Sequence, residues 1–127
     1  MKKLILLVLV LLALACGGSQ DLVGTYDWKE TSGGISGRVE NSENTPKIPA
    51  LVITNDSIKE YENGILMGAR AYHLEIQRSI RTGKNERMII YEDGSIPHSF
   101  KLKGQELVLF EECQDCYQYR YVKTNRP

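Results

Sequence analysis

The residues 113–116, Cys-Gln-Asp-Cys, place two thiols close enough to act together. Such a pair can bind a metal, exchange electrons, remain as free thiols or form a disulfide. A structural zinc site needs two further ligands, and the only histidines, His73 and His98, are isolated in the sequence. Redox exchange favours a pair at the start of a helix, whereas this pair flanks a predicted turn between strands. We expect a Cys113–Cys116 disulfide, with the other three alternatives left open.

An acidic cluster of Glu111, Glu112 and Asp115 adjoins the same turn. Two carboxylates can perform acid–base chemistry when burial raises the pKa of one of them. At the end of a hairpin such residues are ordinarily solvated, so we interpret the cluster as a solvated rim. His98 shares a predicted strand face with Phe100, and we interpret it as a hydrogen-bonded residue of the barrel wall. Because no nucleophile and base occur together, the sequence predicts neither enzymatic activity nor a cofactor or metal.

The N-terminal residues have the organisation of an export signal. Lys2 and Lys3 give a basic start, and residues 4–15 form an unbroken apolar run of twelve. Twelve helical residues reach about 18 Å, too short for a hydrocarbon core of about 30 Å. A basic start, a short apolar stretch and a small residue at its end predict a signal peptide over residues 1–15.

The residues 13–16, Ala-Leu-Ala-Cys, resemble the lipobox of bacterial lipoproteins, in which the signal is removed before a cysteine that becomes diacylated. The resemblance implies that the mature protein begins at Cys16 with palmitate or similar acyl chains, and that residues 16–21 are the lipidated cysteine and a tether. The acyl chains would anchor the protein in the cell envelope, at the periplasmic or the surface face of the outer membrane. An ordinary secretory signal that happens to contain a cysteine is the alternative.

Size and charge limit the possible partners. Removal of the signal leaves 112 of the 127 residues, enough for one domain with one core and a tail at 125–127. The mature part carries 14 basic and 16 acidic residues, a net charge of −2. Nucleic acid binding favours a basic stripe, and none is present, so we expect no nucleic acid partner. We expect a monomer.

Turn-forming pairs punctuate the mature chain and, except between Gly64 and Gly83, recur every eight to eleven residues, a spacing typical of an antiparallel sandwich or barrel. Asn63-Gly64 and Asp93-Gly94 are the strongest hairpin signals, because a tight turn needs positive φ. The segments between the turns alternate apolar and polar residues, which predicts an all-β domain. We expect about eight strands, at 22–30, 50–54, 57–62, 65–80, 86–92, 97–103, 106–111 and 116–123, the fourth bent or split at Gly68.

One connection is unusually long for so small a domain. Residues 31–49 are rich in Gly, Ser, Asn and Glu and contain two prolines near their end. Loops of this length are often binding loops or lids, although a loose insertion has the same composition. Both alternatives stay open at this point.

The ends of the domain resemble those of a known family. Residues 22–28 of the first predicted strand contain Gly24, a spacer and Tyr26, which resembles the glycine–spacer–aromatic start of lipocalin-like proteins, and Trp28 follows on the same face. Residues 115–123 resemble the last strand of small bacterial lipocalin-like lipoproteins, where an Asp-Gly turn leads into alternating aromatics and a basic residue. Here Cys116 stands in place of the usual glycine, and Lys123 in place of the usual arginine.

The resemblance covers residues 22–124 and implies a calycin-type barrel of eight up-and-down strands with room for one small apolar ligand. It also implies that a basic residue of the last strand, Lys123 or Arg120, packs across Trp28 through a cation–π contact that closes the barrel.

The expected barrel and the expected lipoprotein signal together predict a membrane-anchored envelope protein that binds or carries a small apolar ligand. The candidate lining residues are those on predicted inward faces, namely Tyr72, Leu74, Ile76, Phe100, Leu102 and Tyr119. The alternative is a protein-binding envelope lipoprotein, such as a hydrolase inhibitor or a stress or assembly factor, that acts through residues 31–49 and 111–116. The two functions differ in whether the barrel is hollow.

Overall fold

The computed structural model describes residues 21–125, whose regular structure consists of nine β-strands. Residues 1–20 lie outside this range, so the signal peptide, Cys16 and most of the tether stay predictions. The strands in chain order are β1 (Gly24–Gly33), β2 (Glu40–Asn41), β3 (Pro49–Ile53), β4 (Ser57–Glu62), β5 (Ile65–Arg78), β6 (Asn85–Tyr91), β7 (His98–Lys103), β8 (Glu106–Glu111) and β9 (Tyr117–Thr124).

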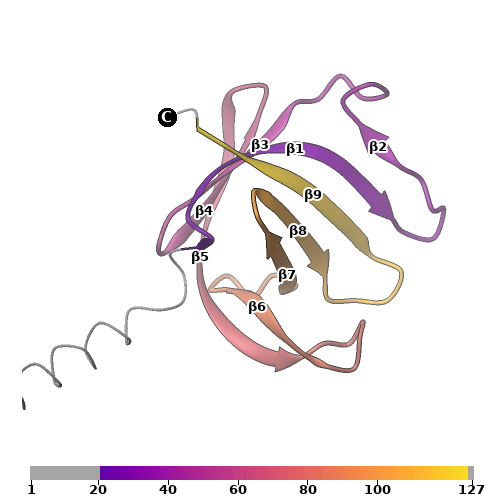
Figure 1. The fold of residues 1–127 in the computed structure, drawn as a ribbon, viewed down its shortest axis with the longest axis vertical. Helices are drawn as coiled ribbons and strands as arrows, with labels where there is room; N and C mark the ends of the chain where they lie inside the picture. The colour runs from indigo at the N-terminus through magenta and orange to yellow at the C-terminus, as the bar shows by residue number, and fades with distance from the viewer. Residues whose placement is uncertain (1–20, 126–127) are drawn as a thin grey trace, which may run out of the picture.

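The strands form one closed antiparallel barrel (Figure 1). From β3 to β9 each strand pairs with the next along the chain, and β1 pairs with both β3 and β9. The short β2 pairs only with Glu30 and Thr31 of β1, outside the circuit of eight. The predicted all-β, eight-stranded up-and-down barrel is therefore confirmed. Closure removes the free sheet edges that an open sheet of this size would expose.

Turn chemistry positions β4 and β5 as the sequence predicts, whereas Asp93-Gly94 lies in the longer 92–97 connection and only Gly94 of that pair has positive φ. At the β4–β5 turn both Asn63 and Gly64 have positive φ, 53° and 78°, which is the requirement of a tight two-residue hairpin. Gly68 does not split β5, which runs unbroken to Arg78. The register with β4 nevertheless shifts next to it, since Glu60 pairs with Gly68 and Tyr61 with Leu66. This bulge gives the long strand its bend.

The two ends of the barrel differ. We call the end where β1 begins the closed end, and the end that carries the β4–β5 turn, the 92–97 connection and the 112–116 turn the open end. Apolar side chains that are essentially inaccessible fill the closed end, namely Leu22, Tyr26, Ile53, Ile58, Ile89 and Leu107. Leu22 precedes β1 instead of starting it, and the Tyr26 hydroxyl donates a hydrogen bond to its carbonyl at 2.8 Å.

The closed end is also tied from outside. Asp21 forms an ion pair with Arg87 of β6 at 3.1 Å, and the Lys123 ammonium lies 3.4 Å from the Asp21 carbonyl. Arg87 holds the pKa of the Asp21 carboxyl below its usual range. These contacts fix the point where the chain enters the barrel.

The predicted inward faces are confirmed in β1 and β7 but wrong at the end of β5. Ile76 shares a face with the buried Tyr72, yet its side chain is 74% exposed. The reason is that β4 pairs with β5 only as far as Ala71, so the following residues have β6 as their single neighbour. No element covers Ile76, although the turn that follows β5 packs against the barrel through Ser79 and Arg81.

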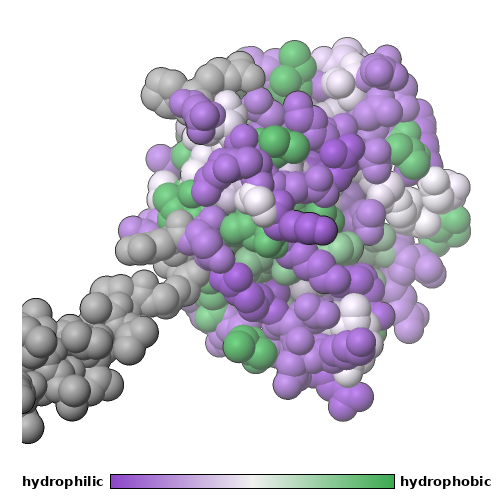
Figure 2. All heavy atoms as spheres, viewed as in Figure 1, coloured by the Kyte–Doolittle hydropathy of each residue, from purple (hydrophilic) through white to green (hydrophobic). Residues whose placement is uncertain are grey.

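The exposed large apolar side chains include three consecutive residues at the start of β5, Ile65, Leu66 and Met67. The face drawn in Figure 2 is mostly hydrophilic, with hydrophobic side chains near its centre and as isolated spots elsewhere. Between residues 21 and 125, no helix is both long and apolar enough to cross a membrane.

Replacing Tyr26 with Phe removes the hydroxyl that satisfies the buried Leu22 carbonyl. We expect the Tyr26→Phe variant to lose about 1–2 kcal/mol of unfolding free energy, because a buried acceptor without its donor keeps its desolvation cost. Urea titration followed by circular dichroism measures this loss. Tyr117→Phe, at a side chain that is 46% exposed, is the matched control and should stay within about 0.5 kcal/mol of the parent. Equal losses in both variants would contradict the role assigned to the bond.

Candidate functional site

A pocket of about 370 Å³ occupies the open half of the barrel and is partly open to solvent. We call it the open-end pocket. Seven strands and the 92–97 connection contribute to its wall. The lining residues are Leu51, Ile58, Glu60, Arg70, Tyr91, Ser95, Ile96, His98, Leu109, Glu111, Tyr119 and Tyr121.

The floor of the open-end pocket is apolar. Leu51, Ile58 and Leu109 are buried and belong to the same cluster that fills the closed end. Tyr121 adds a ring that is only 7% exposed. The barrel is thus packed at one end and hollow at the other, because its largest inward side chains near the closed end meet across the axis.

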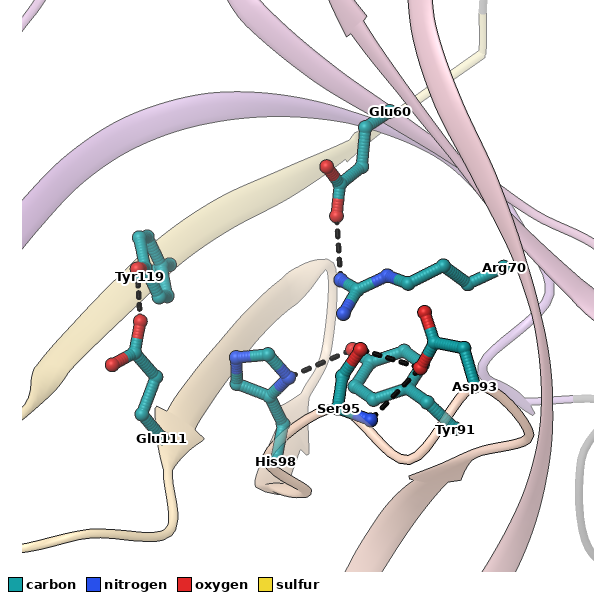
Figure 3. A network of polar contacts seen from close by, with 8 residues as sticks. All are labelled: Glu60, Arg70, Tyr91, Asp93, Ser95, His98, Glu111 and Tyr119. Carbon is teal, nitrogen blue, oxygen red and sulfur yellow. Dashed lines mark hydrogen bonds and ion pairs between the residues drawn. The ribbon is translucent and has the colours of Figure 1, made fainter.

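The walls of the pocket carry a polar network (Figure 3). Arg70 of β5 donates a hydrogen bond to Glu60 of β4 at 2.6 Å, forming a half-buried ion pair. The Arg70 guanidinium also stacks on the Tyr91 ring, 3.7 Å from its centroid. Arg70 is therefore held both by a charge and by an aromatic face, which leaves it little freedom.

His98 forms the second part of the network. Its Nδ1 lies 2.7 Å from the Tyr91 hydroxyl, and the two rings meet edge to face. Burial and the nearby Arg70 charge lower the pKa of His98 from 6.5 to about 4, so the imidazole is neutral at pH 7. Burial also raises the pKa of Tyr91 to about 12. The pair is thus a neutral hydrogen bond, which confirms the interpretation of His98 as a bonded wall residue.

Glu111 and Tyr119 form the third part. The Tyr119 hydroxyl donates a short hydrogen bond to the Glu111 carboxylate. Burial, reinforced by this bond and by the Glu111 charge, raises the pKa of the Tyr119 phenol, so it stays protonated as the donor. In Figure 3 these two residues lie across the pocket from Arg70. Glu111 is therefore part of a site wall.

The interpretation of the whole acidic cluster as a solvated rim is wrong for Glu112 as well. Its side chain is buried, and the buried Ser79 hydroxyl donates a hydrogen bond to it at 2.9 Å. The turn that follows β5 folds back and covers it. Asp115 lies in the turn with positive φ and is exposed as expected.

The structure brings only one of the six candidate ligand residues into the pocket. That residue is Tyr119. Tyr72 and Phe100 belong to the packed core, Leu74 and Leu102 pack against it, and Ile76 is exposed. The alternation of the strands identified inward faces, but it carried no information on which half of the barrel each residue occupies.

β1 and β9 pair and close the barrel. Their side chains, however, contact different partners from those that the resemblance implies. Lys123 lies over the ring of Tyr26, 5.7 Å from its centroid, whereas the resemblance placed the cation over Trp28. Trp28 instead donates to the Thr31 hydroxyl at 2.8 Å. Arg120 approaches Glu30 of β1 at 3.7 Å.

Cys113 and Cys116 are joined in a disulfide, as expected. Together with Glu111 they bring three potential metal ligands within 4.8 Å of one another. Both sulfurs are taken by the disulfide, so neither offers the thiolate that a metal would need. The bond closes the 112–116 turn directly beside Glu111 at the rim.

The long connection does not cover the pocket. Among the described residues that line it, none comes from 34–48. Part of the connection pairs back onto β1 through β2, and Ser36, Arg38 and Glu40 border a second hollow of about 390 Å³, which shares Tyr119 with the open-end pocket. The lid interpretation therefore has no support from this arrangement.

Comparison with protein-family models, with curated proteins and with solved structures finds no match to this chain.

The lowered pKa of His98 makes the stability of the protein depend on pH. The unfolded chain binds a proton near pH 6.5 and the folded chain only near pH 4, so unfolding free energy falls as pH drops through this window. The full effect is about 3 kcal/mol, at about 1.4 kcal/mol for each unit of pKa.

Chemical denaturation of the parent and of His98→Gln at pH 7 and pH 4 isolates this contribution. Other groups titrate in both proteins, so the difference between the two pH dependences belongs to His98. We expect the parent to lose up to about 3 kcal/mol more than the variant. The same pH dependence in both proteins would show that His98 titrates normally in the fold.

Proposed function

We propose that this protein is a lipid-anchored lipoprotein of the cell envelope whose barrel binds a small molecule in the open-end pocket. The observation that carries the proposal is a pocket of about 370 Å³ with an apolar floor and converging polar groups. Small-molecule sites are typically clefts of about 300–1,000 Å³ built in this way, and the mouth of a β-barrel is a common place for them.

The lining favours an amphipathic ligand over a wholly apolar one. Leu51, Ile58 and Leu109 offer an apolar surface at depth, whereas Glu111, Tyr119 and Arg70 stand on the walls. An apolar molecule filling the whole pocket would separate these polar groups from water without giving them partners, which costs free energy. A ligand with an apolar body and a polar group nearer the mouth avoids this cost.

The resemblance to small lipocalin-like lipoproteins agrees with this proposal. An eight-stranded up-and-down barrel with one hollow end is the architecture that the resemblance implies. Tyr26 occupies the position of the first-strand aromatic, and a basic residue of the last strand lies over it. These features support the family assignment, which remains part of the proposal.

The anchor would hold the pocket away from the membrane. Asp21, the first described residue, is tied to the closed end by Arg87 and Lys123. A lipidated Cys16 is joined to this end by a tether of few residues. The mouth of the pocket would then face the aqueous side, where a small molecule could enter without crossing the lipid.

A protein-binding function is the second candidate, and one observation favours it. Ile35 in the long connection is 94% exposed, and Ile48 near its end is 68% exposed. Apolar side chains at such loop positions are suited to contacts with another protein. This function would use the 34–48 connection and the disulfide-closed 112–116 turn and would not need the pocket.

Native mass spectrometry of residues 17–127, exported to the periplasm, tests whether the pocket holds a ligand. We expect an extra mass that organic solvent removes. Leu109→Trp should abolish it, because the indole would occupy the floor of the pocket, whereas Val108→Trp on the other face of β8 should retain it. A bare mass in all three proteins would favour the protein-binding function.

Metabolic labelling with palmitate tests the anchor. We expect the parent chain to incorporate the label and to fractionate with membranes, and Cys16→Ser to lose both properties. Cys113→Ser is the matched control, since its cysteine lies in the disulfide and should not affect labelling. An unlabelled parent, or a labelled Cys16→Ser variant, would contradict the proposed lipoprotein.

A further inference from the structure

The charges on the wall of the open-end pocket do not balance. Among the described residues that line it, the carboxylates are Glu60 and Glu111 and the only permanent cation is Arg70. Arg70 is already paired with Glu60 at 2.6 Å. The carboxylate of Glu111 has a phenol, Tyr119, as its partner instead of a cation. The pocket therefore carries an excess of negative charge centred on Glu111.

His98 and Asp93, which also belong to the network, do not offset this excess. His98 lies between the two sides of the network, but it is neutral at pH 7 because burial lowers its pKa to about 4. Asp93 lies beside Arg70 in Figure 3 and accepts a hydrogen bond from the Ser95 backbone at 2.9 Å. It adds a further negative charge near the mouth. The local field thus attracts cations and repels anions.

The aromatic rings of the pocket also favour a cationic ligand. Arg70 stacks on Tyr91 at 3.7 Å, so one tyrosine of this wall already holds a cation on its face. Tyr119 lines the same pocket beside Glu111, and Tyr121 lines it deeper along β9. A positive group placed there would meet both a carboxylate and aromatic surfaces, which is the combination that stabilises ammonium groups in proteins.

We propose that the open-end pocket is selective for organic cations, namely amines with an apolar body. The ammonium group lies against Glu111 and the ring of Tyr119. The apolar body extends down to Leu51, Ile58 and Leu109. This inference rests on the proposed small-molecule function and deepens it by naming the charge of the ligand.

An anionic ligand fits the pocket poorly. To bind a carboxylate or a phosphate, Arg70 would have to give up Glu60, which would leave that carboxylate without its cation beside a second negative charge. Breaking such a pair costs free energy that the new contact would first have to recover. A neutral ligand would gain nothing from Glu111 beyond an ordinary hydrogen bond.

Isothermal titration with three isosteric probes tests the inference. The probes are phenylbutylamine, phenylbutanol and phenylbutyrate, which share one body and differ in charge. The protein is the purified mature chain. If it is prepared with its lipid in nanodiscs, empty nanodiscs serve as the blank. We expect the amine to bind at least about tenfold more tightly than the alcohol, since hydrogen bonds to charged groups are the stronger ones, and the acid to bind most weakly.

Two variants assign the effect to the charges. Glu111→Gln should weaken the amine about tenfold and leave the alcohol within about twofold. Glu106→Gln, an exposed position on the same strand at the closed end, is the matched control and should change neither. Glu60→Gln releases Arg70 from its partner and should shift the preference towards the acid. If Glu111→Gln does not fold, Glu60→Gln still tests whether the charges of the wall set the preference.

Four results would overturn the inference. Tighter binding of the acid than of the amine, or equal binding of all three probes, would refute selectivity for cations while leaving the small-molecule function intact. Failure of all three to bind at millimolar concentration, together with a bare mass in native mass spectrometry, would overturn both proposals. A neutral or anionic molecule retained from the periplasm would again overturn the inference alone.

Discussion

β1 and β9 lie at opposite ends of the domain sequence and pair antiparallel from Thr25–Thr124 to Gly33–Tyr117, with one bulge after Trp28. This pairing turns a meander of hairpins, each of which is local in sequence, into a closed surface with an inside. Without it the inward faces of the strands would have no opposite wall to pack against. Lys123 over Tyr26 and the Arg120–Glu30 contact both depend on this one long-range register.

Closure also forces the interior to be filled unevenly. Near the closed end large apolar side chains meet across the barrel axis, and Leu22 is buried among them. Along β9 the burial of alternate tyrosines then falls from Tyr121 through Tyr119 to the half-exposed Tyr117. The same strand thus supplies a core residue, a pocket residue and a rim residue in succession. The gradient arises because fewer elements surround each ring towards the open end.

Polar residues can line the open half because each has a partner there. Glu60 with Arg70, Tyr91 with His98, and Tyr119 with Glu111 are three pairs that bridge different neighbouring strands. An unpaired charge at such a position would carry a large desolvation cost. Glu111 is the exception, because its partner is a phenol instead of a cation. Its carboxylate is hydrogen-bonded, but its negative charge is not neutralised. The proposed preference of the pocket for cations rests on this exception.

The sequence by itself determined the eight barrel strands and most of their inward faces, although not the exposed face of Ile76 at the end of β5. β4 and β8 have the bounds that were predicted, and Asn63-Gly64 forms the turn that its residues require, because turn geometry and alternation are local properties of the chain. Tertiary structure decided the pocket. Glu60 and Arg70 lie in one local hairpin, but nothing in the sequence indicates that Glu111 of β8 shares a pocket with them. Which inward residues fill the barrel and which line its hollow end depends on register and closure, and these are set by pairings between strands far apart in the sequence.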